Sequence, residues 1–334
     1  MLSPNFYKMP FPGKIAPRVL LRAEIRGVIM KSVETEVSCV KEIRNKPFAA
    51  KLGLLLMTVI WGSAFSVVKN MTAAMPPSYL IAIRFGLSAV LMGLIFFRRL
   101  GRTGAAEIRG GLLIGFFNVL GFEAQTYGIR YTTAGNSAFL TSVYCVFVPF
   151  LAWAVKRKRP TVFQITSAFV CMAGVGLLSL RSGFTMNFGD FLSLVCGLCF
   201  AAQIIAIDIF TEKCDPILLT VTQSAATALL ALPVAAVSES FPASVGTGTV
   251  LSLLYLAVFS TMIAFLIQLT CQKYVPPSQA SLIMSLESVF GTLCGILFLG
   301  ESMTVRTFFG SALIFGAIYL SERNPARKVL KKAA

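Results

Sequence analysis

The sequence of 334 residues contains no histidine. Imidazole serves as the general base of Ser-His dyads and as a zinc ligand in HExxH metalloproteases, so both kinds of site are excluded. Acidic residues are also scarce, at 14 Asp and Glu, and "NFGDF" (residues 187–191) lacks the GxGD pattern of intramembrane aspartyl proteases. The enzyme alternative is therefore reduced to a membrane-embedded enzyme that uses carboxylates alone. We expect no enzyme, no cofactor and no metal site.

Charge of either sign is sparse, because charged residues make up 13% of the chain and hydrophobic residues 56%. A soluble protein of this length needs more charge to cover its surface. Apolar runs of about 20 residues recur, and each is long enough to cross ~30 Å of hydrocarbon as a helix. The sequence predicts an all-α integral membrane protein with ten transmembrane helices. They are expected at residues 51–69, 78–97, 111–129, 133–155, 161–180, 190–210, 216–237, 250–272, 278–300 and 304–321.

Positive charge is concentrated on one side of this topology. With the N-terminus inside, 25 of the 30 Lys and Arg residues fall on the inner side, which is a strong positive-inside signal. We expect a multi-pass protein of the plasma membrane with both termini in the cytoplasm. Contact with anionic lipid headgroups accounts for the basic tails, so the net charge of +16 requires no nucleic acid partner.

Residues 1–48 read as a basic cytoplasmic extension, and residues 322–334 as a basic cytoplasmic tail. The extension has no apolar core of the length that a signal peptide or a membrane span requires. An equally good interpretation is that translation begins at Met30 and that residues 1–29 are not translated.

The two halves of the chain resemble each other. The matches are weak one by one but ordered along the half. They are Trp61 with Phe200, Pro77 with Pro216 and Arg84 with Gln223 at a shift of 139, and Phe122 with Phe265, Gln125 with Gln268, Tyr131 with Tyr274, Ser142 with Ser285 and Thr161 with Thr304 at a shift of 143. We infer two five-helix repeats, residues 49–181 and 190–321. Five is odd, so the second repeat is expected to cross the membrane in the opposite orientation, as in secondary transporters.

Four stretches carry a family resemblance: "TVIWGSAFSVVKN" (58–70), "IRFGLSAVL" (83–91), "QTYGIRYTTAGNSAFLTSVYCVFVPF" (125–150) and "LIMSLESVFGTLCGILFLGES" (282–302). Together they resemble EamA-type members of the drug/metabolite transporter superfamily. The resemblance implies ten helices, inner termini and movement of small organic solutes without ATP. Its signature positions here are Trp61, Gly62, Lys69, Arg84, Glu287 and Glu301.

Two departures from the family pattern concern polar positions. Members often carry a proline after the glutamate of the ninth helix, where the chain has Ser288, so the helix break at that glutamate is not assured. Many also carry an acidic residue after the fourth helix, where the repeat places Lys158 opposite Glu301.

Glu287 lies mid-span, and intramembrane acids are costly enough to be rare. At 100° per residue it shares a face with small residues, which predicts that it faces the bundle. The opposite, bulky face is expected to meet lipid; it consists of Leu282, Leu286, Val289, Phe290, Leu293, Ile296 and Leu297. Two readings stay open: a carboxylate that fixes helix packing, or a group that handles solute or protons. Tyr144 occupies the equivalent helix of the first repeat.

Further candidates for a substrate or proton pathway come from other spans. Arg84 needs a partner in an apolar helix, and Glu123 is a candidate by depth. Trp61 lies mid-membrane and faces a helix contact or a cavity. The complete candidate set is Glu287, Glu123, Arg84, Trp61, Tyr144, Gln125, Gln268 and Ser288. Lys69, Asp208 and Glu301 lie near helix ends, where snorkelling or capping explains a charge.

These observations favour a secondary transporter that moves a small organic solute, such as a metabolite, amino acid or drug-like compound. Efflux by alternating access is the favoured reading, with proton coupling as a hypothesis. A channel or receptor is disfavoured because no filter-like loop or ligand domain is visible. Substrate, direction, coupling ion and oligomeric state stay open, with a homodimer among the alternatives.

Overall fold

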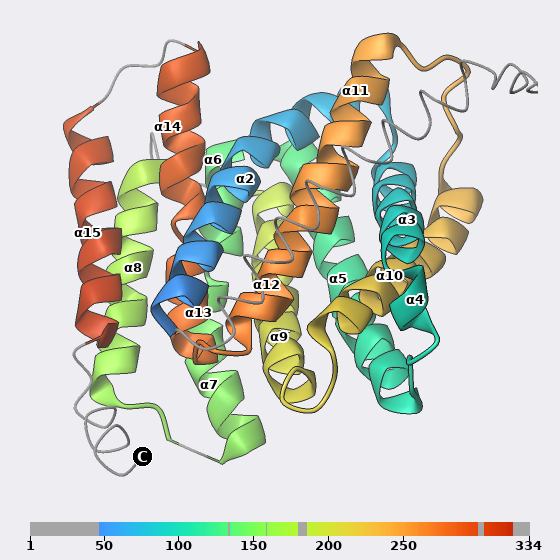
Figure 1. Cartoon of the computed structure of the whole chain (residues 1–334). Helices are drawn as coiled ribbons and strands as arrows, with labels where there is room; N and C mark the ends of the chain where they lie inside the picture. The colour runs from blue at the N-terminus through green and yellow to red at the C-terminus, as the bar shows by residue number, and fades with distance from the viewer. Residues whose placement is uncertain (1–46, 133, 158, 180–185, 300–303, 323–334) are drawn as a thin grey trace, which may run out of the picture. The chain divides into compact units, whose positions relative to one another are not determined.

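The computed structural model describes residues 47–132, 134–157, 159–179, 186–299 and 304–322, all within one compact unit, Ile43–Ala334. This part of the chain contains helices and turns but no strand (Figure 1). Seven of its helices are long and apolar enough to cross a membrane, and Val162–Leu178 and Val305–Ser321 are shorter apolar helices. The expected class, an all-helical membrane protein, is thereby confirmed.

The helices follow the expected spans closely at most ends. The first half contains α2 (Pro47–Ala74), α3 (Pro77–Ile95), α4 (Phe97–Leu100), α5 (Ala105–Tyr131), α6 (Ala134–Thr141), α7 (Tyr144–Lys156) and α8 (Val162–Ser179). The second half contains α9 (Phe188–Phe210), α10 (Pro216–Ser238), α11 (Thr247–Tyr255), the π-helix η1 (Leu256–Ile263), α12 (Ala264–Gln272), α13 (Pro277–Met284), α14 (Glu287–Leu299) and α15 (Val305–Glu322).

Prolines mark several helix starts. Pro77, Pro216 and Pro277 each stand in the first turn, where the missing N–H costs nothing because that group has no partner within the helix. Asp215 caps α10 by accepting a hydrogen bond from the Ile217 N–H at 2.9 Å.

Two of the expected spans are interrupted. The run 133–155 breaks between α6 and α7, and the run 278–300 breaks between α13 and α14. At both breaks the backbone bonds shorten to three-residue steps, from Cys145 N to Ser142 O and from Ser288 N to Ser285 O. A break therefore precedes Glu287 although no proline follows it.

Serines accompany both breaks. Ser142 Oγ donates to Ala138 O at 2.8 Å and Ser285 Oγ donates to Ser281 O at 3.0 Å, one turn earlier in each case. Such back-bonding competes with the backbone ladder and bends helices. We infer that hydroxyl groups here take the role that proline has in many helix breaks.

A third irregularity lies in the run 250–272, where η1 joins α11 to α12. Its widened turn is supported by Thr261 Oγ1, which donates to Leu256 O five residues earlier at 2.8 Å. π-helical turns of this kind are rare and often occur at functional sites.

Helix contacts join the two halves throughout. α8 packs against α15 at one edge of the bundle, and α3 packs against α10 near the other (Figure 1). α2 contacts α12, α13 and α14, while α9 contacts α5, α6 and α7. Glycine permits the closest approaches. A Cβ on Gly62 would lie 2.6 Å from the carbonyl oxygen of Glu287, and one on Gly197 would lie 2.8 Å from that of Thr141.

The first part of the face that was expected to meet lipid is buried instead. Leu282, Leu286 and Val289 are 1%, 2% and 4% exposed, whereas Phe290, Leu293 and Ile296 further along α14 are partly exposed. The prediction was wrong for the first part because α13 is surrounded by α2, α7, α8, α9 and α15, so both of its faces meet protein.

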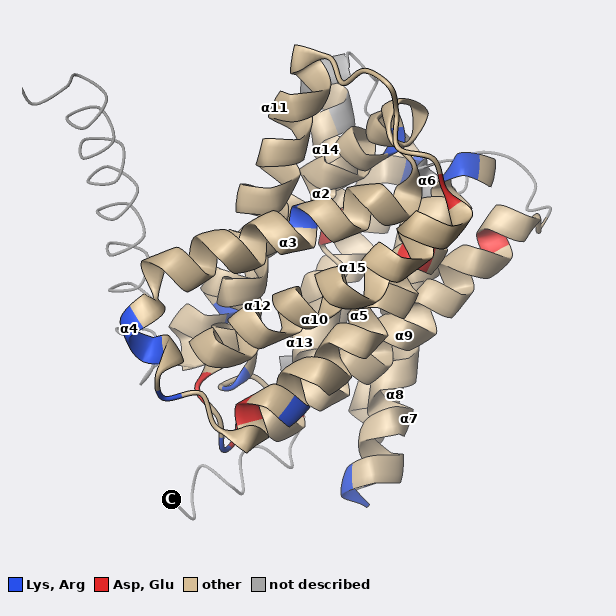
Figure 2. Cartoon of the chain, turned by 90° about the vertical axis from the view of Figure 1, so that its right-hand side faces the viewer, with Lys and Arg blue, Asp and Glu red and all other residues tan. Residues whose placement is uncertain are grey.

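Few charged side chains lie within the helix bodies, and Arg84 of α3 and Glu123 of α5 are among these few. In Figure 2 the basic residues of α4 and of the α7 end stand at helix ends, whereas the long bodies of α9 and α10 are mostly uncharged. A membrane-spanning bundle has this distribution, because a charge at mid-depth is costly.

Candidate functional site

A cavity lies between the two halves of the chain, with about 610 Å³ of empty space when the part open to solvent is included. Its walls are mainly aromatic and aliphatic, with a few polar groups. The lining residues are Trp61, Ala64, Phe65, Val68, Arg84, Asn118, Phe122, Gln125, Ile129, Tyr144, Phe200, Gln203, Ser260, Phe265, Met284 and Glu287.

Glu287 reaches this cavity from the second helix break. It lies in the first turn of α14 and is 4% exposed, so the prediction that it faces the bundle is confirmed. The start of a helix favours a carboxylate because unpaired N–H groups point toward it. The break thus places an acid at a depth where an uninterrupted helix would offer it no such support.

Tyr144 reaches the same cavity from the first break. It is the first residue of α7, is 1% exposed, and donates its hydroxyl to Glu287 Oε1 at 3.1 Å. Behind this contact the hydroxyl oxygens of Ser142 and Ser288 lie 3.3 Å apart. The two helix breaks therefore meet, and their first helical residues are hydrogen-bonded across the interface between the halves.

Arg84 lines the cavity from α3 and is 2% exposed. Its Nε donates to Thr261 Oγ1 at 2.9 Å and its Nη2 to Ser260 Oγ at 3.3 Å. The guanidinium carbon lies 5.4 Å and 5.0 Å from the ring centres of Phe85 and Phe122, within the range of cation–π attraction.

The expected pairing of Arg84 with Glu123 is absent. Glu123 Oε2 instead accepts a hydrogen bond from Ser78 Oγ at 2.9 Å. Hydroxyl groups of η1 and aromatic rings take the place of the carboxylate that sequence depth suggested. Glu123 thus contacts α3 six residues before Arg84, at the beginning of the helix.

Trp61 uses both of the roles open to it. It lines the cavity, and its indole Nε1 donates to the backbone oxygen of Ser260 at 3.0 Å. Its ring meets that of Phe265 edge-on, with 5.4 Å between centres. The widened turn of η1 therefore serves two cavity residues, Trp61 through a carbonyl and Arg84 through hydroxyls.

The remaining candidates lie at different distances from the cavity. Gln125 lines it, with Nε2 3.4 Å from Thr141 Oγ1. Gln268 is not among the lining residues; it lies one layer behind, with its amide 3.4 Å from that of Gln203. Ser288 contacts Ser142 at the break and also lies outside the lining.

Glu123 belongs to a separate group, which we name the Glu239 network. It consists of Ser78, Tyr79, Glu123, Tyr127 and Glu239. Glu239 accepts hydrogen bonds from the backbone N–H of Ser78 and Tyr79, at 3.1 Å each, and from the Tyr127 hydroxyl. This carboxylate follows α10 and caps α3, so it ties the beginning of one helix to the end of another.

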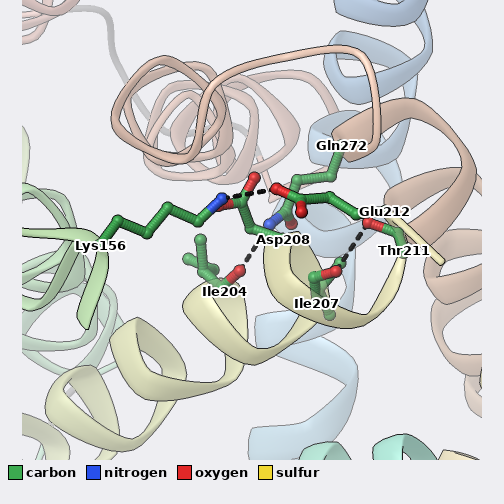
Figure 3. A network of polar contacts seen from close by, with 7 residues as sticks. All are labelled: Lys156, Ile204, Ile207, Asp208, Thr211, Glu212 and Gln272. Atoms are coloured by element: carbon green, nitrogen blue, oxygen red, sulfur yellow. Dashed lines mark hydrogen bonds and ion pairs between the residues drawn. The ribbon is translucent and has the colours of Figure 1, made fainter. Parts of the chain in front are cut away.

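A second polar group, the Lys156 network, joins the ends of α7 and α9 (Figure 3). Lys156 Nζ lies 2.6 Å from Asp208 Oδ2 and 2.8 Å from Glu212 Oε1. Beside it Gln272 Nε2 donates to Ile204 O at 2.7 Å and connects α12 to α9. Asp208 is therefore a partner in an ion pair and does more than cap a helix.

Lys69 fits the expected capping role. Its Nζ donates to Ile129 O and to Thr132 O, which belong to the C-terminal end of α5. Cations are favoured there because the last carbonyls of a helix lack partners. Glu301 and Lys158 lie outside the described residues.

Several residues of the site were not anticipated. Ser260 and Thr261 hold Arg84, and Asn118 and Gln203 line the cavity. Adjacent hydroxyl residues in the middle of the apolar run 250–272 were the available signal. Glu239 lies beyond the end of an apolar run and carried no signal of its own.

Comparison with known proteins agrees with this architecture. The model of the EamA-like transporter family matches residues 49–180 and 187–323. An uncharacterized transporter of Archaeoglobus fulgidus is 35% identical over 82% of this chain and 86% of its own length. A probable amino-acid metabolite efflux pump of Salmonella typhimurium is 26% identical over 80% and 92%. A crystal structure with 17% identity and a TM-score of 0.67 covers 82% of this chain and 97% of its own, which speaks for the fold alone. The chain is a membrane protein that belongs to the EamA-like transporter family.

Proposed function

We propose that the protein is a secondary transporter that moves a small organic solute by alternating access, with the cavity between the halves as its binding site. The observation that carries the proposal is the meeting of the two helix breaks at this cavity, where Tyr144 and Glu287 contact each other. Transporters built from repeats commonly bind solute where interrupted helices meet near the midplane.

Repeat-related positions support two inverted repeats, residues 49–181 and 190–321. Tyr144 and Glu287 are 143 positions apart, like Ser142 and Ser285 at the breaks. Trp61 with Phe200 and Phe122 with Phe265 also line the cavity as repeat-related pairs. The pairs α3 with α10 and α8 with α15 join helices of the same rank in each half, as a twofold relation would require.

The complete topology is part of the proposal. It has ten membrane-spanning helices, with α6–α7, α11–α12 and α13–α14 each counted as one span. Both termini face the cytoplasm at the plasma membrane, where lipid headgroups contact the basic ends, residues 1–48 and 322–334. Efflux is the proposed direction, supported by the printed name of the Salmonella relative. The proposed partners are the solute and membrane lipid, without nucleic acid.

Glu287 is the proposed coupling group. It is an acid held at the contact between the halves, where rocking of one half against the other would change which side of the membrane it meets. A carboxyl group that loads and releases a proton on opposite sides links solute movement to the proton gradient. Tyr144 orients it through the hydrogen bond from its hydroxyl.

The two polar networks are the proposed gates. The Lys156 network ties α7 to α9, and the Glu239 network ties α3 to the end of α10 and to α5. Ion pairs and charge-assisted hydrogen bonds at the two ends of a bundle can form and break alternately as helices shift.

The experiment uses proteoliposomes of the full chain with a pH-sensitive dye inside and an imposed pH gradient. Solutes are first selected by the metabolite sensitivity of a deletion strain. Addition of such a solute should dissipate the gradient and release the solute chemically unchanged, which separates a transporter from an enzyme.

Glu287→Gln keeps the shape of the side chain and most of its hydrogen bonding but cannot ionise. We expect it to reach the membrane at normal levels and to lose gradient-driven transport, while exchange of solute across the bilayer survives. Tyr144→Phe is the matched control, because it removes the hydrogen bond and keeps the acid. It should transport more slowly and stay coupled. An unchanged pH profile in Glu287→Gln would refute the coupling role.

A further inference from the structure

Arg84 is a buried cation without a carboxylate partner. None of the ion pairs formed within the described residues includes it, and the residue is 2% exposed. A guanidinium carries five N–H donors. Two hydrogen bonds to protein are formed, one each to Thr261 and Ser260.

The contacts of Arg84 hold the guanidinium in place but leave its charge uncompensated. Hydroxyl oxygens and the rings of Phe85 and Phe122 are uncharged, so they lower the cost of burial without removing the positive charge. A buried ion without a counterion is strongly unfavourable. The donors that remain are therefore available to an anion that enters the cavity.

The other residues that line the cavity indicate what kind of molecule carries this anionic group. Six aromatic side chains line it: Trp61, Phe65, Phe122, Tyr144, Phe200 and Phe265. Such walls favour an apolar or aromatic body over a heavily hydrated one. Asn118 adds a polar group to this wall, and its Nδ2 donates to Gln223 Oε1 at 3.3 Å.

We propose that the cavity binds a small organic acid with an apolar body and that Arg84 receives its carboxylate. This inference deepens the proposed transport function and rests on it. The planar fork of a guanidinium matches a carboxylate with two parallel N–H···O bonds, and charge-assisted bonds of this kind are about twice as strong as neutral ones.

A carboxylate fits the charges of the cavity better than a phosphate does. Among the lining residues of the described chain, Arg84 is the one cation and Glu287 the one acid. Arg84 can neutralise one of the two charges of a dianion, and no other cation among the described lining residues is available for the second. A monoanion is neutralised by Arg84 alone.

A tryptophan in the cavity wall allows ligand binding to be followed by fluorescence. The chain has two tryptophans, of which Trp61 lines the cavity and Trp153 is 42% exposed on α7. A Trp153→Phe variant of the full chain in nanodiscs therefore reports cavity binding through tryptophan fluorescence. Trp61→Phe, with Trp153 retained, is the blank that should show no response.

Three probes share one apolar body and differ in charge: 3-phenylpropanoate, 3-phenylpropanamide and 3-phenylpropylammonium. We expect the carboxylate to bind at least about 10-fold more tightly than the amide, as loss of one charge-assisted contact implies, and the ammonium not to bind. Equal affinity for the carboxylate and the amide overturns the proposal, even if no Arg84 variant can be purified.

Arg84 variants then locate the effect. Arg84→Gln should reduce the affinity for 3-phenylpropanoate to that for the amide, and Arg84→Lys should recover part of it. Ser88→Ala is the matched control, because Ser88 lies one turn further along α3, outside the lining, and its hydroxyl forms no hydrogen bond with the described residues, so the affinity should change less than about 3-fold. Retained preference for the carboxylate in a folded Arg84→Gln variant overturns the assignment to Arg84.

The outcome is separable from that of the transport proposal. Gradient-driven flux that depends on Glu287, together with no preference for the carboxylate probe, leaves the transporter and refutes this inference. Arg84-dependent binding of 3-phenylpropanoate without flux of any solute supports the inference and refutes the transporter.

Discussion

Two hydrogen bonds that join the halves are related by the repeat and differ in charge. Arg84 of α3 donates to Thr261 of η1, and Asn118 of α5 donates to Gln223 of α10 at 3.3 Å. The shift of 139 aligns Arg84 with Gln223, and the shift of 143 aligns Asn118 with Thr261. Repeat-related positions thus make both contacts between the halves, but only one of the two contacts contains an ion.

The helix breaks differ in the same way. Tyr144 and Glu287 are repeat-related and begin α7 and α14 after similar serine-supported turns. One half supplies a neutral hydroxyl and the other an acid, whereas at the α3 position the first half supplies the cation. We infer that the backbone plan is shared by the halves and that each half adds one charged group to the cavity.

The largest expected effect concerns the orientation of the halves. If the second repeat is inverted, reporter fusions at Lys158 and Glu301, which the repeat aligns, should report opposite sides of the membrane, Lys158 in the cytoplasm and Glu301 outside. The readout is all-or-none for a pair of alkaline phosphatase and green fluorescent protein fusions. If both fusions report the same side of the membrane, the two halves are not inverted repeats.

The close approaches at the breaks should be equally intolerant in both halves. Gly62→Ala would place a methyl group 2.6 Å from Glu287 O, and Gly197→Ala would place one 2.8 Å from Thr141 O. Both oxygens belong to the backbone, which cannot rotate away, so we expect each variant to lose roughly 1–3 kcal/mol of stability. Thermal unfolding in detergent measures the loss. The matched control is Gly86→Ala, whose methyl group would find its nearest neighbour at 3.7 Å.

A difference greater than about 2 kcal/mol between the two glycine variants would argue against a shared plan. Gly62→Ala should in addition impair transport in the protein that does fold, because it displaces the backbone of Glu287. Gly197→Ala should impair folding alone.

The charge difference predicts unequal effects on transport. Arg84→Gln makes the first half resemble the second and should reduce the transport rate by about 10-fold or more, since it removes the cation of the cavity. Gln223→Leu should reduce it by less than about 3-fold, because Gln223 lies outside the lining and its Nε2 already lacks a partner. Rates are normalised to the protein in the membrane. Equal losses would mean that both contacts serve packing.

Predictions from the sequence were most successful where the polarity of a side chain alone determines whether it faces protein or lipid. Glu287 shares a helical face with small residues, and it faces protein because an acid has no alternative in a membrane. The same argument failed for the opposite face of Leu282, Leu286 and Val289. Lipid and protein interior are both apolar, so a bulky apolar face does not reveal which of them it meets.

The contacts that side chains make with neighbouring helices could not be predicted from the sequence, for a different reason. Position along a helix gives an approximate depth, and depth alone does not identify the residue that a side chain contacts. The direction of Arg84 depends on how α3 packs against η1, and a π-helix has no reliable sequence signal. The hydroxyls of Ser260 and Thr261 were visible in the sequence, but their widened turn was not.

The smallest expected effect comes from the Lys156 network. This network contains ion pairs, whereas the Glu239 network contains no cation and therefore no ion pair. Lys156 and Asp208 are 31% and 14% exposed at the side chain, so their pairing is only partly shielded from water. Ion pairs in such settings contribute ~0.2–1 kcal/mol, so Lys156→Gln should lower the unfolding temperature only slightly.

If the pair is a gate, the effect of Lys156→Gln appears in the kinetics of transport. The closed state at that end loses a contact that the open state never had, so opening becomes faster and less dependent on salt concentration. Stopped-flow measurements of solute efflux at low and high salt would detect this change in opening rate. Arg99→Gln is the control, because Arg99 pairs with Asp215 at 3.3 Å between α4 and the start of α10, away from the α7–α9 contact. A salt dependence that is the same in the wild type and in Lys156→Gln would assign this network to folding and leave the cavity without a gate at that end.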